Sequence, residues 1–235
     1  MHQSNASISP NRKFGFPVPT FYGPMRLGSM DNGWYDTWEE YFTREFRANL
    51  AYAQHSRGDD TEFADLAEEF VQKVLPRLLR PLETGGRIIR PTLCHGDLWD
   101  GNIQMDLDSK QPRFFDFSSF YGHHEMDFQE MGHPRYALGR EFIDLYIKEV
   151  GASEPQEDLE DRLTLYSMRN DICGTGMWHE WGSLMPGYAT ISLVVYHLDM
   201  PASAQLTVHR VKTQMRRLLA KYPNGYDDFK PNKSM

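Results

Sequence analysis

Residues 95–102 of this 235-residue chain form a polar loop that limits the folds open to it. The loop reads His-Gly-Asp-Leu-Trp-Asp-Gly-Asn, and a short apolar segment after it ends in Phe-Asp-Phe over 115–117. This pattern places two carboxylates and one amide, those of Asp97, Asp116 and Asn102, on a loop and a neighbouring strand. Such an oxygen-rich set suits a magnesium ion and the hydroxyl that accepts a phosphoryl group.

Composition limits the class of protein. Of the residues, 40% are apolar and 13% aromatic, enough to bury a core in one large domain or two small ones. The net charge of -8 argues against nucleic-acid binding, because neutralising phosphates requires clustered lysine and arginine. Cys94 and Cys173 are too few for a disulfide framework and favour a reducing compartment such as the cytoplasm. No apolar stretch has the length of a membrane span, so we expect no membrane partner.

The first part of the chain predicts two amphipathic helices after an irregular start. Residues 1–33 are rich in Pro, Gly, Ser and Asn, and we expect 1–8 to be disordered. Apolar residues then recur at helical spacing over 34–50. A second helical pattern covers 63–79, and Pro76 is expected to kink or split that helix.

The later part predicts a hairpin followed by helices. Residues 102–105 and 113–117 flank a polar turn and are typical of paired strands, with Asp116 at the end of the second strand. Helices are then expected over 124–150, 158–180, 188–199 and 203–221, with breaks at Gly151, Gly182, Pro186-Gly187 and Pro201. The polar tail 222–235 is expected to be frayed. The predicted fold class is therefore mainly α with a small β hairpin, an α+β chain.

Asp97, Asn102 and Asp116 fit the chemistry of phosphoryl transfer to an alcohol. Asp97 would accept the hydroxyl proton, and its spacing to Asn102 is that of the D-x-x-x-x-N catalytic loop. One amide oxygen and one carboxylate are a sufficient protein contribution to a magnesium site. The structural alternative is that Asp97 and Asn102 only cap a turn. A carboxylate that follows Phe114 and Phe115 would need a partner, which favours the metal site.

Two motifs resemble those of the fructosamine kinases, also called ketosamine 3-kinases or protein-ribulosamine 3-kinases. The first reads Cys-His-Gly-Asp-Leu-Trp-Asp-Gly-Asn over 94–102, and the second reads Phe-Asp-Phe-Ser-Ser-Phe-Tyr-Gly-His-His-Glu-Met-Asp over 115–127. Residues 9–16, Trp34 and Trp38 are also similar to that family. The resemblance runs from about residue 9 to about residue 220. It implies the helical carboxy-terminal lobe of a protein-kinase-like fold, in its aminoglycoside-phosphotransferase-like branch.

The resemblance also implies roles for five residues. Asp97 would be the catalytic base, and Asn102 and Asp116 would be magnesium ligands. His95 would pack or form hydrogen bonds within the catalytic loop. Asp127 would organise the site from behind that loop, or serve only as a carboxylate at a helix N-terminus.

The implied activity is ATP-dependent phosphorylation, with Mg2+, of the O3 hydroxyl of a ketosamine. The substrates would be ribulosamine or fructosamine on glycated protein lysines, or small ketosamines, and the reaction would begin deglycation. Trp178, His179 and Trp181 are candidates for contacts with the sugar, with packing at helical spacing as the competing interpretation. This segment and Phe117-Ser118 depart from the usual family pattern, and both departures could reshape the acceptor pocket.

The parts of a complete kinase that hold the ATP phosphates are not found before His95. No G-x-G-x-x-G motif precedes it, and Lys13 and Lys73 lack the strand context of a phosphate-anchoring lysine. We therefore expect the carboxy-terminal lobe alone, over 9–221 with its catalytic loop at 95–102. A dimer or a partner chain could cover the surface on which the other lobe would dock.

Two other functions remain open from the residues. A non-catalytic lobe could bind a ligand or a partner through the same cleft. A metal-dependent hydrolase could use His95, Asp97 and Asp116. The His-His-Glu run at 123–125 does not have the spacing of a common zinc site, so its histidines are expected to face solvent or to pack in a loop.

Overall fold

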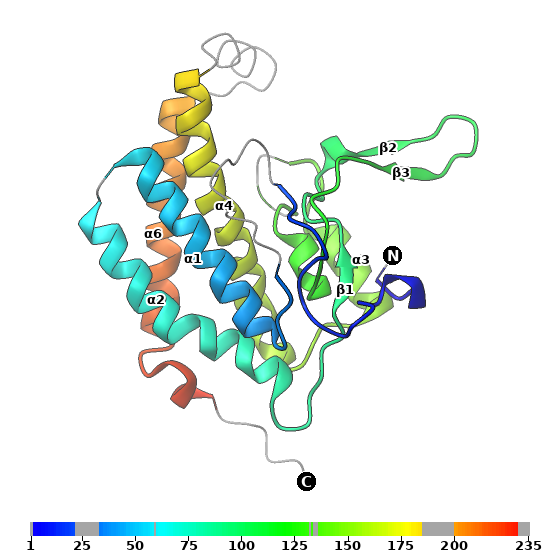
Figure 1. The fold of residues 1–235 in the computed structure, drawn as a ribbon, viewed down its shortest axis with the longest axis horizontal. Coiled ribbons are helices and arrows are strands. Elements are labelled where there is room, and N and C mark those ends of the chain that lie inside the picture. The colour runs from blue at the N-terminus through cyan, green and yellow to red at the C-terminus, as the bar shows by residue number, and fades with distance from the viewer. Residues whose placement is uncertain are drawn as a thin grey trace.

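Long helices and a smaller part that contains the strands make up the fold. The computed structural model describes residues 2–21, 33–58, 60–131, 133, 136–184 and 200–229, without the side chains of 178–205. Helices α1, α2, α4 and α6 lie side by side, and the strands and α3 lie beside them (Figure 1). No helix in this described part is long and apolar enough to cross a membrane.

Side-chain caps explain where the first two helices begin. Helix α1 spans Trp38–Arg57, and α2 spans Thr61–Leu79. Thr37 accepts a hydrogen bond from the backbone of the first turn of α1 at 3.2 Å, and Asp60 does the same for α2 at 2.9 Å. Each cap satisfies a backbone donor that has no partner inside its helix. The other helices are α3 (Arg140–Val150), α4 (Leu159–Leu184) and α6 (Met200–Lys221).

The strands form short antiparallel pairs. Strand β1 (Thr92–Cys94) pairs with β4 (Phe120–Gly122), and β2 (Ile103–Met105) pairs with β3 (Pro112–Phe114). The β2–β3 hairpin extends away from the helices (Figure 1) and confirms the predicted hairpin. Short 3₁₀ helices are η1 (Asn5–Ser7), η2 (Arg80–Glu83), η3 (Asp100–Asn102), η4 (His124–Phe128), η5 (Gln156–Asp158) and η6 (Gly225–Asp228). The mainly helical α+β class is as predicted.

The first two helices differ in detail from the prediction. Helix α1 begins at Trp38 rather than at residue 34, because Tyr35 pairs with Phe14 in an antiparallel bridge. Helix α2 continues through Pro76, so the expected split is wrong. A proline lacks one N–H donor, and burial of the apolar face of α2 outweighs that loss.

The later helices confirm part of the predicted pattern. Helices α4 and α6 match the predictions over 158–180 and 203–221, although α4 has no break at Gly182. Pro201 lies in the first turn of α6, where a proline leaves no helical hydrogen bond unmade. The predicted helix over 124–150 is instead two elements, η4 over His124–Phe128 and α3 over Arg140–Val150. The predicted helix over 188–199 lies outside the described residues.

Both ends of the described chain contact the rest of the fold, where the sequence predicts a disordered start at 1–8 and a frayed tail at 222–235. Within residues 2–8, Ile8 forms a bridge to Thr92 of β1. Residues 222–229 pack on α2, where the Arg77 guanidinium lies 4.5 Å from the centre of the Tyr222 ring. These long-range contacts outweigh the polar composition that predicted loose ends. The residues after 229 lie outside the described part.

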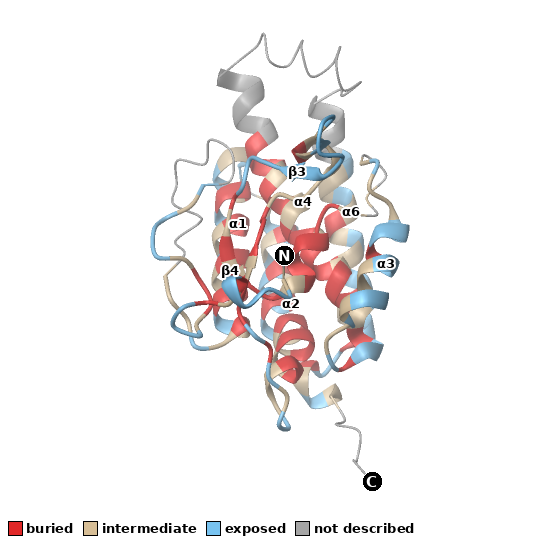
Figure 2. Ribbon diagram, turned by 90° about the vertical axis from the view of Figure 1, so that its right-hand side faces the viewer, coloured by how far each residue is buried: buried red, intermediate tan, exposed pale blue. Residues whose placement is uncertain are grey.

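The hydrophobic core is centred on Trp38 of α1. This side chain is fully buried, and its indole N–H donates to the Tyr166 hydroxyl of α4 at 3.0 Å. The ring of Phe120 in β4 lies parallel to the indole, with centroids 6.4 Å apart. The buried residues lie where the long helices face each other and the strands (Figure 2). The core therefore ties the strands, and the loop between them, to α1 and α4.

A fully buried ion pair joins η4 to α4. Arg162 donates to both carboxylate oxygens of Glu125, at 2.8 and 3.0 Å. It also donates to the carbonyl oxygens of Ser153 and Pro155, while Glu125 accepts the backbone N–H of Ser153. The charges are thus paired and hydrogen-bonded, the condition under which buried charges are tolerated.

Breaking this pair is expected to destabilise the fold strongly. We expect Arg162→Met to lower the free energy of unfolding by about 3–5 kcal/mol, because it leaves the Glu125 carboxylate buried and unpaired. The matched control is Arg140→Met, which breaks the exposed pairs with Asp144 and Glu160 and should cost less than about 1 kcal/mol. Urea denaturation followed by circular dichroism measures both changes. Equal costs would contradict the stabilising role of the buried pair.

The partly buried His124 predicts a loss of stability in mild acid. Burial lowers its pKa from 6.5 to about 4, although the nearby Glu125 opposes the shift. Below pH 6.5 the unfolded chain binds a proton that the folded chain excludes, so the free energy of unfolding falls towards pH 4. This group alone should account for about 3 kcal/mol. We expect His124→Gln to remove that part of the decrease in urea denaturation between these pH values, and an equal decrease in both proteins would contradict this.

Candidate active site

The buried carboxylate of Asp127, in η4, holds the backbone of the loop that follows β1. It accepts the N–H groups of His95 and Gly96, each at 2.9 Å. Asp127 is fully buried, so these donors replace the water that its charge would otherwise require. The Asp127 carboxylate therefore lies behind the loop and accepts two of its backbone N–H groups.

Gly96 allows the loop to approach the chain beyond the hairpin closely. Its φ is +83°, a region that favours glycine, and a Cβ here would lie 2.1 Å from the carbonyl oxygen of Ser118. The Ser118 N–H in turn donates to the His95 carbonyl oxygen at 2.9 Å. The loop is therefore held on one side by Asp127 and on the other by the backbone at Ser118.

Asp97 and Asn102 lie together, as the sequence spacing predicts. The Asn102 side chain donates through Nδ2 to the backbone carbonyl of Asp97 at 2.9 Å and to its carboxylate at 3.0 Å. Asn102 is 4% exposed, whereas Asp97 is half-buried and reaches solvent. The amide thus fixes a carboxylate that stays accessible to a reacting molecule.

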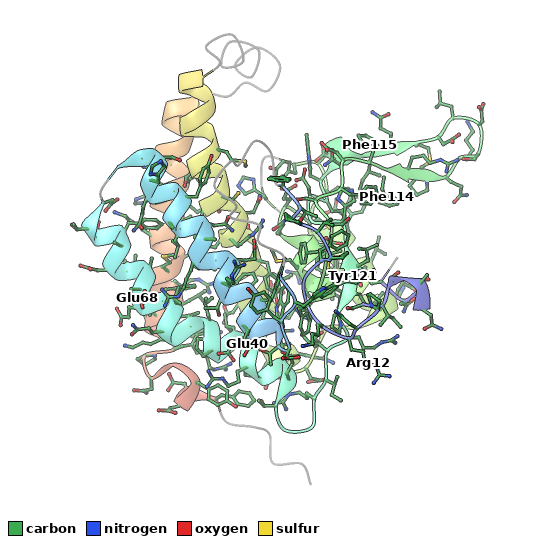
Figure 3. All side chains as sticks on the ribbon, viewed as in Figure 1. Arg12, Glu40, Glu68, Phe114, Phe115 and Tyr121 are labelled. Carbon is green, nitrogen blue, oxygen red and sulfur yellow. The ribbon has the colours of Figure 1, made fainter. Side chains whose placement is uncertain are left out.

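Asp116 lies beside this loop but in a different environment from the one predicted. The N–H of Phe115 donates to the Asn102 carbonyl oxygen at 3.2 Å, which places Asp116 next to the Asn102 end of the loop. Strand β3 ends at Phe114, and Asp116 follows in a bend with φ of +58°. Its side chain is exposed, as are those of Phe114, Phe115 and Phe117. The carboxylate that was expected to need a partner is therefore exposed, at the base of the hairpin near Phe114 and Phe115 (Figure 3).

His95 is buried and has structural contacts. Its Nδ1 accepts the N–H of Asp97 at 3.3 Å, and its ring centre lies 4.3 Å from that of Phe117. No residue in the described part of the chain pairs with its Nε2. These contacts agree with packing and hydrogen bonding within the loop.

Asp116 and Asn102 each offer an oxygen atom to a hard cation. Because Asn102 uses Nδ2 for both contacts with Asp97, its Oδ1 remains available. Among the described residues none donates a hydrogen bond to this Oδ1 or to the Asp116 carboxylate. One amide oxygen and one free carboxylate fit Mg2+, which keeps several of its own waters.

The remaining sequence candidates separate into two groups. The side chains of Trp178, His179 and Trp181 lie outside the described residues. The His-His-Glu run at 123–125 packs in the fold. His123 is fully buried, and its ring nitrogens contact the hydroxyls of Tyr166 and Ser153 at 2.8 and 2.7 Å. Ligand atoms of His123, His124 and Glu125 lie close enough together to hold a metal ion. Each of these three side chains already has a protein partner.

Sequence reasoning missed a buried polar chain behind the loop. Gln129 donates to the Gly96 carbonyl oxygen at 2.7 Å, and Arg169 of α4 contacts both Gln129 and Glu45 of α1. Each of these side chains is 3% exposed or less. They are 33 to 124 residues from their partners, so no local pattern in the sequence points to them.

The close approach at Gly96 gives a sharp test of the loop geometry. We expect Gly96→Ala to lower the free energy of unfolding by at least about 2 kcal/mol more than Gly86→Ala. Gly86 has nearly the same φ, +84°, but a Cβ there meets no atom within 4 Å, so it reports backbone strain alone. Thermal and urea denaturation measure both variants. Equal costs would mean that the contact between Gly96 and Ser118 is not tight in solution.

The chain is similar to known proteins over most of its length. The family model described as fructosamine kinase matches residues 1–172. The ketosamine-3-kinase of Mus musculus is 31% identical over 181 residues, which cover 77% of this chain and 52% of the mouse protein. The chloroplastic protein-ribulosamine 3-kinase of Arabidopsis thaliana is 26% identical over 191 residues, which cover 80% of this chain and 54% of the plant protein. The chain thus spans about half the length of these curated relatives.

Solved structures share the fold. Two proteins assigned as fructosamine-3-kinases, from Haemophilus somnus 129PT and Thermobifida fusca YX-ER1, superpose with TM-scores of 0.57 and 0.59. They are 18% and 17% identical and cover 93% and 92% of this chain, which in turn covers 59% and 60% of theirs. The matching family model, supported by these relatives, shows that the chain belongs to the fructosamine kinase family.

Proposed function

We propose that the loop at 95–102 serves ATP-dependent phosphorylation of the O3 hydroxyl of ketosamines, with Asp97 as the catalytic base. The observation that carries the proposal is the contact between Asp97 and Asn102, which holds an accessible carboxylate beside a free amide oxygen. Membership of the fructosamine kinase family supports the same reading. Because the chain spans about half of its relatives' length, the whole reaction is part of the proposal.

The proposed step is a direct transfer between two oxygens. The sugar O3 attacks the γ-phosphorus of ATP, the bond from that phosphorus to the β,γ-bridging oxygen breaks, and ADP leaves. Asp97 accepts the O3 proton through the carboxylate that Asn102 orients. Positioning matters more than basicity in such a step, since holding the reactants in line removes much of the barrier.

Asn102 and Asp116 would hold the Mg2+ that accompanies ATP. Bound there, the ion would neutralise the charge of the nucleotide phosphates as the bond breaks. The protein's own contribution is two oxygen ligands, one on Asn102, which is fixed by Asp97, and one on the exposed Asp116.

The names of the relatives suggest the class of acceptor. One relative is a ketosamine-3-kinase and another is a protein-ribulosamine 3-kinase. We infer that this chain acts on ribulosamine or fructosamine groups, on glycated protein lysines or in small ketosamines. Phosphorylation at O3 would then begin their removal.

The two alternative functions are not favoured. The curated relatives are named kinases, which weighs against a lobe that only binds. The hydrolase hypothesis needs His95, Asp97 and Asp116 to converge on one metal ion, but these three are not among the groups of described residues whose ligand atoms lie close enough together to hold one.

The proposal predicts that phosphate transfer depends on Asp97. With Mg2+ and ATP, the chain is expected to phosphorylate ribulosyl-lysine or fructosyl-lysine, and Asp97→Asn should lower kcat by about 10²–10⁴-fold. Product formation is measured by mass spectrometry and ADP release. The control is Asp108→Asn, at the exposed turn of the hairpin, which should leave the rate unchanged. Transfer that is insensitive to Asp97→Asn, or no transfer by the folded wild-type chain, would contradict the proposal.

A further inference from the structure

The peptide group between Gly96 and Asp97 is held from both sides. Its carbonyl oxygen accepts a hydrogen bond from the Gln129 side chain at 2.7 Å, and its N–H donates to Nδ1 of His95 at 3.3 Å. The preceding peptide group is held in the same way, by Asp127 and by the N–H of Ser118. The orientation of the Asp97 backbone therefore depends on the Gln129 side chain, which lies outside the two family motifs at 94–102 and 115–127.

Gln129 can offer its amide hydrogens to the loop only in one orientation. Its Oε1 accepts from the Arg169 guanidinium at 3.5 Å, while its Nε2 donates to Gly96. If the carboxamide were flipped, its oxygen would face the Gly96 carbonyl oxygen and its NH2 group would face the Arg169 guanidinium. Both contacts would be repulsive. Arg169 thus selects the orientation in which Gln129 holds the loop.

Arg169 is itself fixed by a buried charge. Its guanidinium forms an ion pair with the Glu45 carboxylate at 3.3 Å, and both side chains are nearly inaccessible to water. Glu45 lies on α1 and Arg169 on α4, so the position of the guanidinium is set by the packing of two core helices. The contacts form one chain from Glu45 to Arg169, to Gln129 and to the peptide beside Asp97.

We propose that Gln129 is a positioning residue for Asp97, oriented by the Arg169–Glu45 pair. The inference rests on the proposed function, because that function makes Asp97 a base that must be positioned. Gln129 does not touch the reacting atoms. It restrains the peptide plane that precedes Asp97, and an error of about 1 Å in such a group costs about 10²-fold in rate.

The test replaces the donor and keeps the shape. In Gln129→Met, the methionine side chain has a length similar to that of glutamine but no amide group. Gln72→Met is the matched control, because Gln72 is exposed on α2. We expect Gln129→Met to lower kcat at least about tenfold and to change KM for ATP less than about twofold. Amide hydrogen exchange over 95–99 should become about tenfold faster. Gln72→Met should change none of these.

A second variant tests the orienting pair and keeps the proposal falsifiable if Gln129→Met folds poorly. Glu45→Gln is expected to lower kcat and to speed up amide hydrogen exchange over 95–99, in both cases by less than Gln129→Met does. Combined with Gln129→Met, it should add nothing to the loss of the single variant, because Glu45 acts through Gln129. A merely structural role would instead lower thermal stability and leave kcat unchanged below the melting temperature.

The outcomes separate this inference from the proposed function. The role of Gln129 would be overturned if amide hydrogen exchange over 95–99 were the same in Gln129→Met as in the wild-type chain. It would also be overturned if the effects of Gln129→Met and Glu45→Gln were additive in the double variant. If the wild-type chain transfers no phosphate, the proposed function fails. The exchange measurements and the double-variant comparison still decide whether Gln129 holds the loop.

Discussion

The buried carboxylate of Asp127 is the interaction on which the candidate site depends. A charge in this position must be matched by donors, and the loop supplies them as the N–H groups of His95 and Gly96. If the loop moved away, this buried carboxylate would lose two of its hydrogen-bond donors. The conformation that presents Asp97 is therefore enforced by the cost of burying Asp127, and not by the preferences of the loop residues alone.

The site has a rigid half and an exposed half. Asp97 and Asn102 are joined by hydrogen bonds, and the two peptide groups before Asp97 are held from both sides. Asp116 lies in a bend among exposed phenylalanines. This division suits the proposed reaction, in which Asp97 as the base must be placed accurately. Asp116, as a proposed metal ligand, can adjust when a hydrated ion and its nucleotide bind.

Local interactions could be predicted from the sequence, and distant ones could not. The pairing of Asp97 with Asn102 and the hairpin join residues that are close in the chain, so spacing and residue type suffice. The start of α1 was misplaced because Tyr35 pairs with distant Phe14. The exposure of Asp116 depends on how the hairpin leaves the core, which no pattern of apolar residues records.

The first residues of the chain show how such distant contacts converge on the site. His2 contacts Asp127 at 2.9 Å through Nε2 and the Tyr146 hydroxyl at 2.8 Å through Nδ1, so it links the carboxylate behind the loop to α3. Further along, Gly15 forms a bridge to Tyr121 of β4. Composition alone predicted disorder for residues 1–8, because it counts the polar residues and not the partners that the fold brings to them. A buried charge attracts donors from any part of the chain that can reach it, and here His2 reaches it.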